Sequence, residues 1–249
     1  MQKYQLFEMR RPEIEAALAN GADTAVATFG ATEQHGLHLP MGTDSIWGEE
    51  LGLRVTQALG NALQAPGLRI GCSEHHMDFS GSLTLSNETF YLVVEDTCRS
   101  LAHHGFKNIV LIPTHGGNFR PIGAAAERIR KVLPDVNIID YNDLMAFMGV
   151  LFGVAAEFGF TPEHTGGHAG ENETSLILAL RPELVDMSVA EAGYVGDMLS
   201  IAPTIMKDGF KGITENGVLG NPEGARPDIG EAYLKAMTAD IVAHVKKNL

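Results

Sequence analysis

Glu33, His35 and Asp44 place two carboxylates and an imidazole within one short, turn-rich stretch of the sequence. Side chains two residues apart point to the same side of an extended backbone, and the glycines and proline before Asp44 favour bends that return it to the other two. Oxygen and imidazole ligands suit Zn²⁺, Mn²⁺ or Fe²⁺, and a bridging aspartate can hold two such ions. The stretch therefore indicates a metal site, with an ordinary polar surface loop as the alternative.

A second cluster, His115-Gly116-Gly117-Asn118, follows the apolar run from Lys107 to Pro113. This run predicts a buried strand, and open α/β sheets bind ligands at the carboxyl ends of their strands. We therefore expect His115 at the same sheet edge as the first cluster, where the two glycines let the backbone approach an ion or substrate. Asn118 is expected either to cap the next helix or to donate its amide to a substrate. The alternative is a tight turn whose histidine only packs.

A third cluster contains His168, Glu171 and Glu173 in a glycine-rich loop that runs into a predicted helix. Two residues apart on a helix, the two carboxylates diverge by about 200°. We therefore expect only one of them to act as a ligand or base, while the other stabilises the helix N-terminus.

A fourth segment, from Gly71 to Ser86, is polar and lies between a predicted strand and a predicted helix. Its side chains Ser73, Glu74 and His76 are candidates for a substrate pocket, and exposed surface is an equal alternative.

The composition predicts a soluble, cytoplasmic α/β protein with one domain over residues 1–249. Hydrophobic residues make up 45% of the chain, enough for a well-buried core. No apolar run reaches the roughly 18 residues that a membrane-spanning helix needs. Two cysteines cannot form a disulfide framework, and we expect each to be a small buried hydrophobe. The net charge of −13 argues against nucleic-acid or membrane partners.

Alternating helices and strands predict a mainly parallel sheet. The expected strands are 24–29, 68–71, 107–113 and 136–139, and the expected helices are 12–20, 45–59, 87–104, 118–132, 142–158, 171–180 and 228–248. The stretch from Ala190 to Pro227 is rich in glycine and proline and has little periodicity. We expect it either to cover the site or to meet a neighbouring subunit.

The four clusters, in this order, resemble the motifs of the creatininase (creatinine amidohydrolase) family. The matching motifs are Gly30-Ala31-Thr32-Glu33-Gln34-His35-Gly36 with Leu39-Pro40 and Thr43-Asp44, then Phe79 to Leu85, then His115-Gly116-Gly117-Asn118, and then His168-Ala169-Gly170 with Glu173-Thr174-Ser175. The resemblance implies a three-layer α/β/α fold with a mainly parallel central sheet. It also implies a two-metal centre, a homo-oligomer that is often a hexamer, and hydrolysis of amides that are usually cyclic or formyl.

The resemblance also assigns the ligands. It implies that Glu33 and His35 bind different ions, that Asp44 bridges the ions, and that His115 binds the same ion as Glu33. Glu173 is the expected fifth ligand, with Glu171 as the alternative.

Two positions depart from the pattern of the creatinine-hydrolysing member of the family. That member has a glutamate where this chain has Gly117 and a substrate-contacting aromatic residue where it has Gly116. Creatinine is therefore not the expected substrate, and the chain resembles another branch. Substrate choice is expected to depend on the Ser73 to Ser82 loop and on the Ala190 to Pro227 stretch.

The expected reaction is attack of a metal-activated water on the carbonyl of a small, neutral, polar amide, and the resemblance implies a cyclic one. His168 is expected to move the proton, Glu173 to be a ligand or base, and Ser73, His76 and Asn118 to contact the substrate. Alternatives within the family are a formamide deformylase, a peptidase of a modified peptide, and a hydrolase that cleaves a carbon–carbon bond of a cyclic polyol ketone.

Two hypotheses belong to other classes. A metal-free hydrolase would need an activated nucleophile, but the chain has no Gly-x-Ser-x-Gly motif and only Cys72 and Cys98 as thiols. The other hypothesis is an inactive binding or scaffold protein, which the missing glutamate at Gly117 supports.

Overall fold

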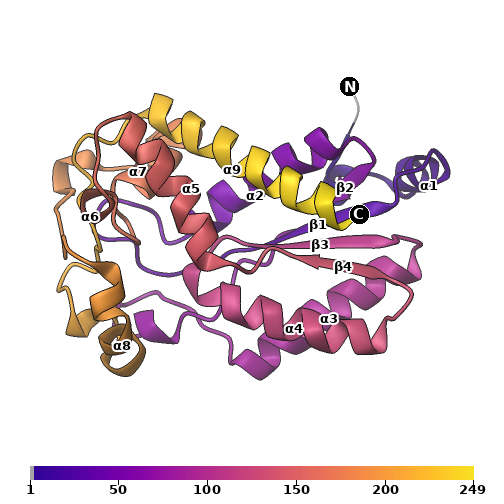
Figure 1. The fold of residues 1–249 in the computed structure, drawn as a ribbon, viewed down its shortest axis with the longest axis horizontal. Coiled ribbons are helices and arrows are strands. Elements are labelled where there is room, and N and C mark those ends of the chain that lie inside the picture. Colours follow the sequence, from indigo (N-terminus) through magenta and orange to yellow (C-terminus); the bar gives the residue numbers. More distant parts are fainter. Residues whose placement is uncertain (1–2) are drawn as a thin grey trace.

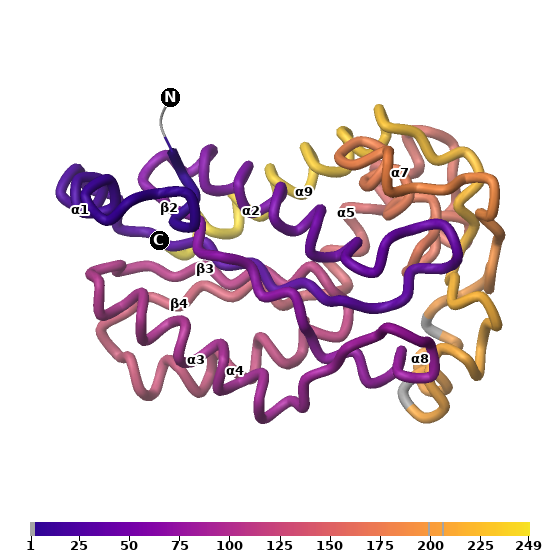
Figure 2. The backbone as a smooth tube through the Cα atoms, turned by 180° about the vertical axis from the view of Figure 1, so that it is seen from behind, coloured from indigo at the N-terminus to yellow at the C-terminus, as the bar shows by residue number. Residues whose placement is uncertain are grey.

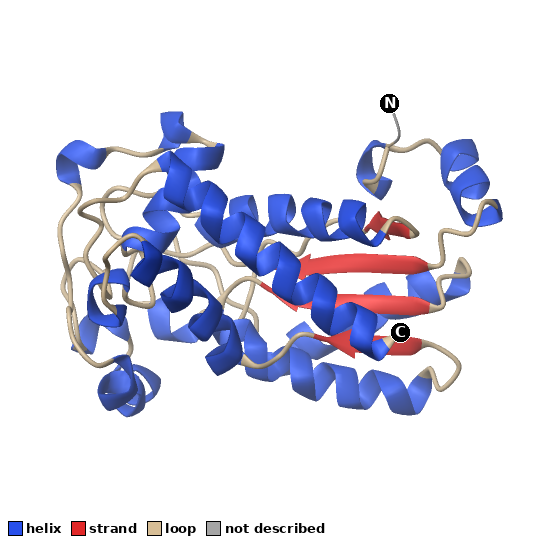
Figure 3. Cartoon of the chain, turned by 45° about the horizontal axis from the view of Figure 1, so that its top comes forward, coloured by secondary structure: helices blue, strands red, loops and turns tan. Residues whose placement is uncertain are grey.

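A four-stranded parallel sheet forms the centre of the molecule (Figures 1 and 3). The structure, a computed structural model, describes residues 3–249 apart from the side chains of residues 199 and 206. The strands lie in the order β2-β1-β3-β4. Their bounds are Thr24–Phe29 for β1, Ala62–Gln64 for β2, Asn108–Pro113 for β3 and Asn137–Asp140 for β4. The mainly parallel sheet that the sequence predicts is confirmed.

Both faces of the sheet are covered, which explains why its strands are apolar at almost every position. Val26 pairs with Val110 and Ala27 pairs with Leu111, so each pair of neighbours in register points to the same face. The two valines belong to one hydrophobic cluster, and Ala27 and Leu111 belong to another on the opposite face. The result is a three-layer α/β/α fold, as the sequence analysis expects.

The helices divide between the two faces of the sheet (Figure 1). One layer contains α2 (Thr43–Leu59), α5 (Leu144–Glu157), α7 (Glu171–Leu180) and α9 (Pro227–Asn248). The other contains α3 (Asn87–His103) and α4 (Phe119–Val132). At opposite ends of the view lie α1 (Arg11–Ala19) and the pair α6 (Pro162–Thr165) and α8 (Met198–Asp208). None of the described helices is both long and apolar enough to cross a membrane.

Long connections gather at the carboxyl end of the strands, on the side of α6 and α8 (Figure 2). They include the segments that follow β1 and β3 and much of the stretch from residue 190 to 227. The first two meet because β1 and β3 are neighbours, with Phe29 opposite Pro113 at their ends. The clusters that begin at Glu33 and His115 therefore start from adjacent points of the sheet edge.

Two expected elements differ from the observed ones. Instead of a strand at 68–71, Leu68 forms only an isolated bridge with Phe29, and the paired segment lies earlier, at β2. Pro66 has no N–H for the ladder and separates the two segments. The stretch from 190 to 227 contains α8, a helix that its interior Pro203 conceals from a search for helical periodicity. The other expected elements agree with the observed ones within a few residues.

The packing of α7 against α9 depends on Gly230 and is open to a direct test. A Cβ atom at this position would overlap the carbonyl oxygen of Ser175 in α7. We expect Gly230→Ala to lower the free energy of unfolding by about 2 kcal/mol or more, because the two helices must separate to make room. Urea unfolding followed by circular dichroism measures this change.

Gly149 in α5 provides the matched control, since a Cβ there meets no atom within 4 Å. We expect Gly149→Ala to raise the free energy of unfolding by about 0.5 to 1 kcal/mol through helix propensity alone. Equal effects of the two substitutions would contradict the close packing at Gly230.

Candidate metal centre

Five buried side chains that can bind metal come together at the carboxyl edge of the sheet. Three lie in the segments that follow β1 and β3, and two lie in the first turns of α2 and α7. They are Glu33, His35, His115, Asp44 and Glu173, and each is at most 9% exposed. The fold therefore gathers all five of the metal ligands that the sequence analysis expects.

Asp44 lies between two pairs of these side chains. Its Oδ1 is 3.2 Å from Nε2 of His35, and Oε2 of Glu173 is 3.7 Å from the same nitrogen. Its Oδ2 is 3.1 Å from Nδ1 of His115, and Oε1 of Glu33 is also 3.1 Å from that nitrogen. Asp44 thus shares His35 with Glu173 on one side and His115 with Glu33 on the other. This division matches the one that the resemblance implies.

Backbone carbonyls set the tautomers of the two histidines. Nδ1 of His35 lies 3.1 Å from the carbonyl oxygen of Glu33, and Nε2 of His115 lies 3.2 Å from that of Cys72. Because a carbonyl oxygen can only accept, each of these ring nitrogens carries the proton. The other nitrogen of each ring then directs its lone pair at the carboxylates, which is the usual arrangement of a metal-binding histidine.

Several oxygens of the carboxylates receive no hydrogen bond. Both carboxylate oxygens of Glu33 and Oδ2 of Asp44 are buried without a hydrogen-bond partner. Among the residues that the structure describes, the only ion-pair partners of Glu33, Asp44 and Glu173 are histidines. Buried carboxylates without partners are costly, so the cluster fits a bound cation.

The pKa values of the two histidines report the same negative field. Burial opposes a charge on His35, but the carboxylates of Asp44 and Glu173 raise its pKa well above the ordinary value. Burial also opposes a charge on His115, but Glu33 and Asp44 raise its pKa to about 10. The carboxylates therefore attract a positive charge to the place where a metal ion would displace the protons.

His168 faces the centre with an unprotonated nitrogen. Its Nε2 donates to the backbone carbonyl of Gln34 at 2.7 Å, which leaves Nδ1 as the acceptor. Nδ1 is 3.9 Å from Oε1 of Glu33 and 4.0 Å from Oε2 of Glu173. Burial, followed by the positive charge of His35, lowers the pKa of His168 well below its usual value. A neutral imidazole that points its lone pair at the ligands is suited to accept a proton there.

Gln34 orients a further histidine and was not singled out in the sequence. Its Oε1 accepts from the N–H of Gly36 at 2.9 Å, so its amide group donates to Nδ1 of His76 and to the carbonyl of Gly217, both at 3.1 Å. His76 therefore carries its proton on Nε2, 3.2 Å from Oε1 of Glu33. A protonated nitrogen in this position supports the carboxylate electrostatically and is not a metal ligand, although it lies close to other ligand atoms.

The structure separates the two candidate glutamates of α7. Glu171 accepts hydrogen bonds from the hydroxyls of Tyr233 at 2.6 Å and Ser175 at 2.7 Å, so it ties α7 to α9. Glu173 instead points at His35, and the backbone N–H of Ala169 holds its Oε2 at 2.6 Å. The structure thus brings Glu173, and not Glu171, to the cluster.

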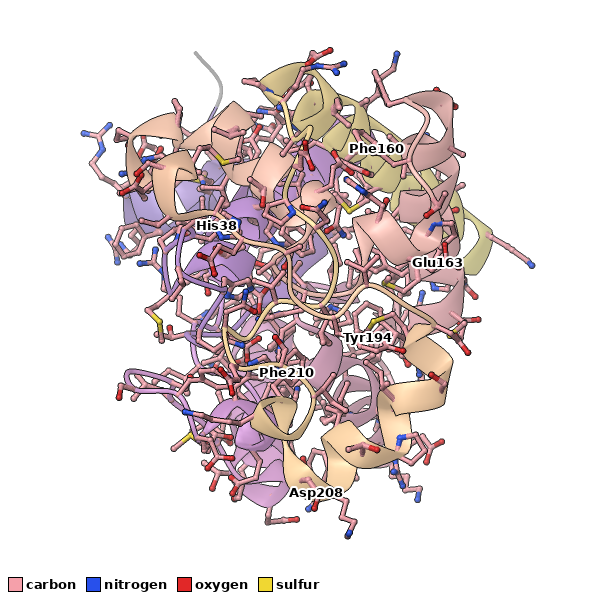
Figure 4. The ribbon with its side chains drawn as sticks, turned by 90° about the vertical axis from the view of Figure 1, so that its left-hand side faces the viewer. His38, Phe160, Glu163, Tyr194, Asp208 and Phe210 are labelled. Atoms are coloured by element: carbon pink, nitrogen blue, oxygen red, sulfur yellow. The ribbon has the colours of Figure 1, made fainter. Side chains whose placement is uncertain are left out.

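A cavity of about 350 Å³ opens beside the centre and reaches it at Gly116 and Glu173. Its walls are mainly apolar and come largely from α5 and α8. Figure 4 looks at this end of the molecule, where the loop that carries Tyr194 crosses between Glu163 and Phe210. The phenyl ring of Phe210 lies 4.9 Å from the ring of His168, so the stretch from 190 to 227 covers the site, as one of the two expectations states.

The three side chains expected to contact substrate do not line this cavity. The amide of Asn118 donates to the carbonyls of Phe29 and Gly30 at 2.9 and 3.0 Å and accepts from the N–H of Cys72 at 2.9 Å. It therefore holds the loops together, and it makes no capping bond to α4. Ser73 is fully buried, and His76 supports Glu33. The loop from 73 to 82 likewise contributes nothing to the cavity wall.

The cavity residues were missed because the sequence analysis searched for polar side chains. The apolar start of α5, Leu144 to Phe152, supplies much of the wall. Its only sequence signal is a high content of methionine and phenylalanine, which is equally typical of a buried helix.

Both thiols are poorly suited to nucleophilic catalysis. Cys72 and Cys98 are buried, as predicted. Burial raises the pKa of Cys72 to about 11 and that of Cys98 to about 12. A thiolate is the reactive form, so these values argue against the thiol version of a metal-free hydrolase.

Together, the doubly wound α/β fold and the shared carboxylate define an α/β protein with a candidate two-ion centre at the carboxyl ends of its strands. The model of the family described as creatinine amidohydrolase matches residues 7–245. The chain belongs to this creatininase family of hydrolases, which confirms the family predicted from the motifs.

Relatives within the family have different names and, by those names, different substrates. The creatinine amidohydrolase of Pseudomonas putida is 32% identical over 190 residues, 72% of this chain and 73% of the relative. The mycofactocin precursor peptide peptidase of Mycobacterium tuberculosis strain H37Rv is 28% identical over 242 residues, 92% and 87% of the two chains. The 3-dehydro-scyllo-inosose hydrolase of Thermotoga maritima is 25% identical over 170 residues, 66% and 52%.

Solved creatininase structures share the whole fold. A crystal structure of creatinine amidohydrolase superposes with a TM-score of 0.81 at 26% identity and covers 99% of this chain and 98% of its own. A manganese form of creatininase has a TM-score of 0.79 at 26% identity and covers 98% of each chain. A mutant creatininase of Zn-Zn type has the same TM-score and identity and covers 99% and 98%.

His38 makes the stability of the fold depend on pH. The hydroxyl of Thr174 donates to the carbonyl of Gly170 and so accepts from Nε2 of His38 at 2.9 Å. Burial, and then the charge of His35, lowers the pKa of His38 to about 4. An unfolded histidine binds its proton near pH 6.5, so the unfolded state gains protons first and stability falls as the pH drops through this window.

Glutamine keeps a hydrogen-bond donor and does not titrate. We therefore expect the free energy of unfolding to fall less in His38→Gln than in the wild type between pH about 7 and about 4.5, with a difference of about 2 kcal/mol. Urea unfolding with a chelator present measures this difference without a contribution from metal. Equal losses in the two proteins would show that His38 is not held neutral in the fold.

Proposed function

We propose that the protein is a metal-dependent hydrolase that binds two divalent ions and hydrolyses an amide. Glu33, His115 and Asp44 would hold one ion, and His35, Glu173 and Asp44 would hold the other. The observation that carries this proposal is the position of Asp44, whose two oxygens face two different histidines inside a buried cluster in which several carboxylate oxygens have no hydrogen-bond partner. Two divalent cations would offset the charge that the protein leaves unpaired.

The chemistry follows from the donor set and from His168. Divalent ions held by carboxylates and imidazoles lower the pKa of water and polarise a carbonyl group. His168 supplies a neutral Nδ1 on the side of the ligands, so it can accept the proton of the attacking water. The same nitrogen can return the proton to the leaving amine. The carbonyl of Gln34 keeps the imidazole in this orientation throughout.

The identity of the metal is inferred from the ligand types. Carboxylate and imidazole donors accept Zn²⁺, Mn²⁺ and Fe²⁺. Zinc and manganese forms are found among the similar creatininase structures, which supports these two ions first.

An amide is the preferred substrate class, and creatinine itself is disfavoured. A Cβ at Gly117 would overlap the carbonyl oxygen of Cys72 and the ring of His115, so the backbone has no room for the glutamate of the creatinine-hydrolysing pattern. The peptidase relatives cover most of this chain, which supports a linear amide. Hydrolysis of a formamide or of a cyclic ketone stays an alternative, and the inosose hydrolase relative supports the ketone.

The remaining expectations are part of the same proposal. We infer a single catalytic domain over residues 1–249 that works in the cytoplasm as a homo-oligomer, for which the resemblance implies a hexamer as a frequent form. The net charge of −13 supports a small-molecule or peptide substrate over a nucleic acid or an anionic membrane.

Metal content tests the centre directly. We expect wild-type protein purified without chelator to hold about two divalent ions per chain, and Asp44→Asn and Glu173→Gln to lose at least one of them, because each removes a ligand. Elemental analysis by mass spectrometry measures the number of ions.

Glu171→Gln is the matched control, since it changes a buried glutamate of the same helix that bonds to Tyr233 instead of facing the centre. It is expected to keep both ions and to lose about 1 to 3 kcal/mol of stability. Loss of metal in Glu171→Gln alone, or the absence of metal in wild type after reconstitution with Zn²⁺ and Mn²⁺, would refute the assignment.

Removal of His168 separates an enzyme from a binding protein. We expect His168→Gln to keep both ions and to lower the rate of hydrolysis by about 100-fold to 10,000-fold, because it removes only the proton acceptor. The assay follows amine release from a panel of formamides and small dipeptides. Hydrolysis at the wild-type rate in His168→Gln would exclude this mechanism, and wild-type protein with two ions and no turnover on any substrate class would favour the inactive scaffold.

A further inference from the structure

We propose that the substrate carries a bulky, mainly apolar group without negative charge, which occupies the cavity beside the metal centre. This inference rests on the proposed function and narrows its substrate class. It departs from the small polar amide that the sequence analysis favours. The juxtaposition of Gly116, Glu173 and the apolar walls of α5 and α8 is the observation that carries it.

The cavity provides the approach to the candidate ligands. Glu173 is the most exposed of the five, at 9%, whereas Glu33 and His35 have no exposed surface. Glu173 also lines the cavity, together with Gly116 directly after His115. A molecule whose carbonyl reaches the centre from this side therefore places its adjoining group inside the cavity.

The cavity walls select for an apolar group. The lining includes Phe147 and Leu151 of α5 and Met198 and Ile205 of α8, with Leu176 of α7 behind them. A volume of about 350 Å³ is large for a compact polar molecule and admits an aromatic or branched aliphatic side chain. A small polar substrate would leave these walls in contact with water, so it would gain no binding free energy from burial of apolar surface.

Gly116 keeps the inner end of the cavity open. A Cβ atom placed on Gly116 meets no atom within 4 Å, and its φ angle lies outside the positive range. A side chain at this position would therefore extend into free space next to the centre without straining the backbone. The glycine therefore leaves this space to the substrate.

The charges along the cavity are of one sign. Glu163 and Asp197 lie on its wall, and neither lysine nor arginine is among the described lining residues. A carboxylate or phosphate on the group that enters the cavity would meet negative charge in an apolar surrounding. A neutral group or an amine would not, so the lining disfavours anions.

Trp47 makes occupancy of the cavity measurable without catalysis. It is the one tryptophan of the chain, it lines the cavity, and its ring stacks against Phe147 with 6.2 Å between the ring centroids. Its fluorescence is therefore expected to change when a molecule binds in this space or at the metal centre beside it.

The experiment uses the metal-loaded protein and three amino-acid hydroxamates that share one metal-binding group and differ in the side chain. Titration of Trp47 fluorescence gives the Kd of each. We expect L-phenylalanine hydroxamate to bind about ten-fold to a hundred-fold more tightly than glycine hydroxamate, since it buries an aromatic side chain. L-Aspartic acid β-hydroxamate, which retains its α-carboxylate, is expected to bind more weakly than glycine hydroxamate.

Two substitutions assign the effect to the cavity. Gly116→Leu fills the inner end and is expected to remove most of the preference for phenylalanine hydroxamate. Gly149→Leu is the matched control, because Gly149 has no neighbour within 4 Å of a Cβ and lies outside the cavity lining. We expect it to leave all three Kd values unchanged. The exposed substitution Glu163→Lys is expected to tighten binding of the aspartic acid derivative several-fold and to leave glycine hydroxamate unaffected.

The outcomes separate this inference from the proposed function. Equal affinity for the phenylalanine and glycine derivatives, or an equal loss of both in Gly116→Leu, would overturn the apolar-group proposal and leave the metal centre intact. Failure of glycine hydroxamate to bind a protein that also holds no metal would overturn the proposed function itself. Tighter binding of the aspartic acid derivative than of glycine hydroxamate would refute the charge selectivity.

Discussion

Three buried carboxylates within reach of one another are the constraint on which the rest of the site depends. Glu33, Asp44 and Glu173 have only histidines as ion-pair partners among the described residues, and several of their oxygens have no hydrogen-bond partner. Such a cluster is unfavourable unless a cation joins it. The surrounding protein prepares for that cation, because backbone carbonyls hold His35 and His115 as tautomers with their lone pairs directed inward.

The sheet brings the first members of this cluster together. Neighbouring parallel strands β1 and β3 end side by side, so two segments far apart in the sequence begin at one edge. Helix α7 then brings Glu173 to His35, and the position of this helix depends on the close packing of Ser175 against Gly230 in α9. The buried hydrogen bonds of Glu171 to Ser175 and Tyr233 strengthen the same contact. The residues that pack α7 against α9 therefore contribute both to the stability of the fold and to the position of the Glu173 carboxylate.

In the proposed enzyme, the charged centre carries out the reaction and the apolar cavity next to it determines which substrate binds. The centre would act on a carbonyl group, which many substrate classes share. The walls from α5 and α8, together with the space above Gly116, distinguish among those classes. Different names among relatives of one fold agree with this division, since they share the family and differ in substrate.

The sequence by itself determined the fold class, the family and the identity of the metal-ligand candidates, because these depend on local pattern: apolar strands, glycine-rich turns, and carboxylate and imidazole side chains at the strand ends. Only the tertiary structure separated Glu173 from Glu171, since their directions depend on how α7 packs against α9. It also showed that Asn118 holds the loops together instead of facing the cavity. The cavity itself appeared only in the structure, because its apolar wall residues resemble ordinary core residues in the sequence. Which side chains face a space depends on contacts between distant segments, and no local pattern records those contacts.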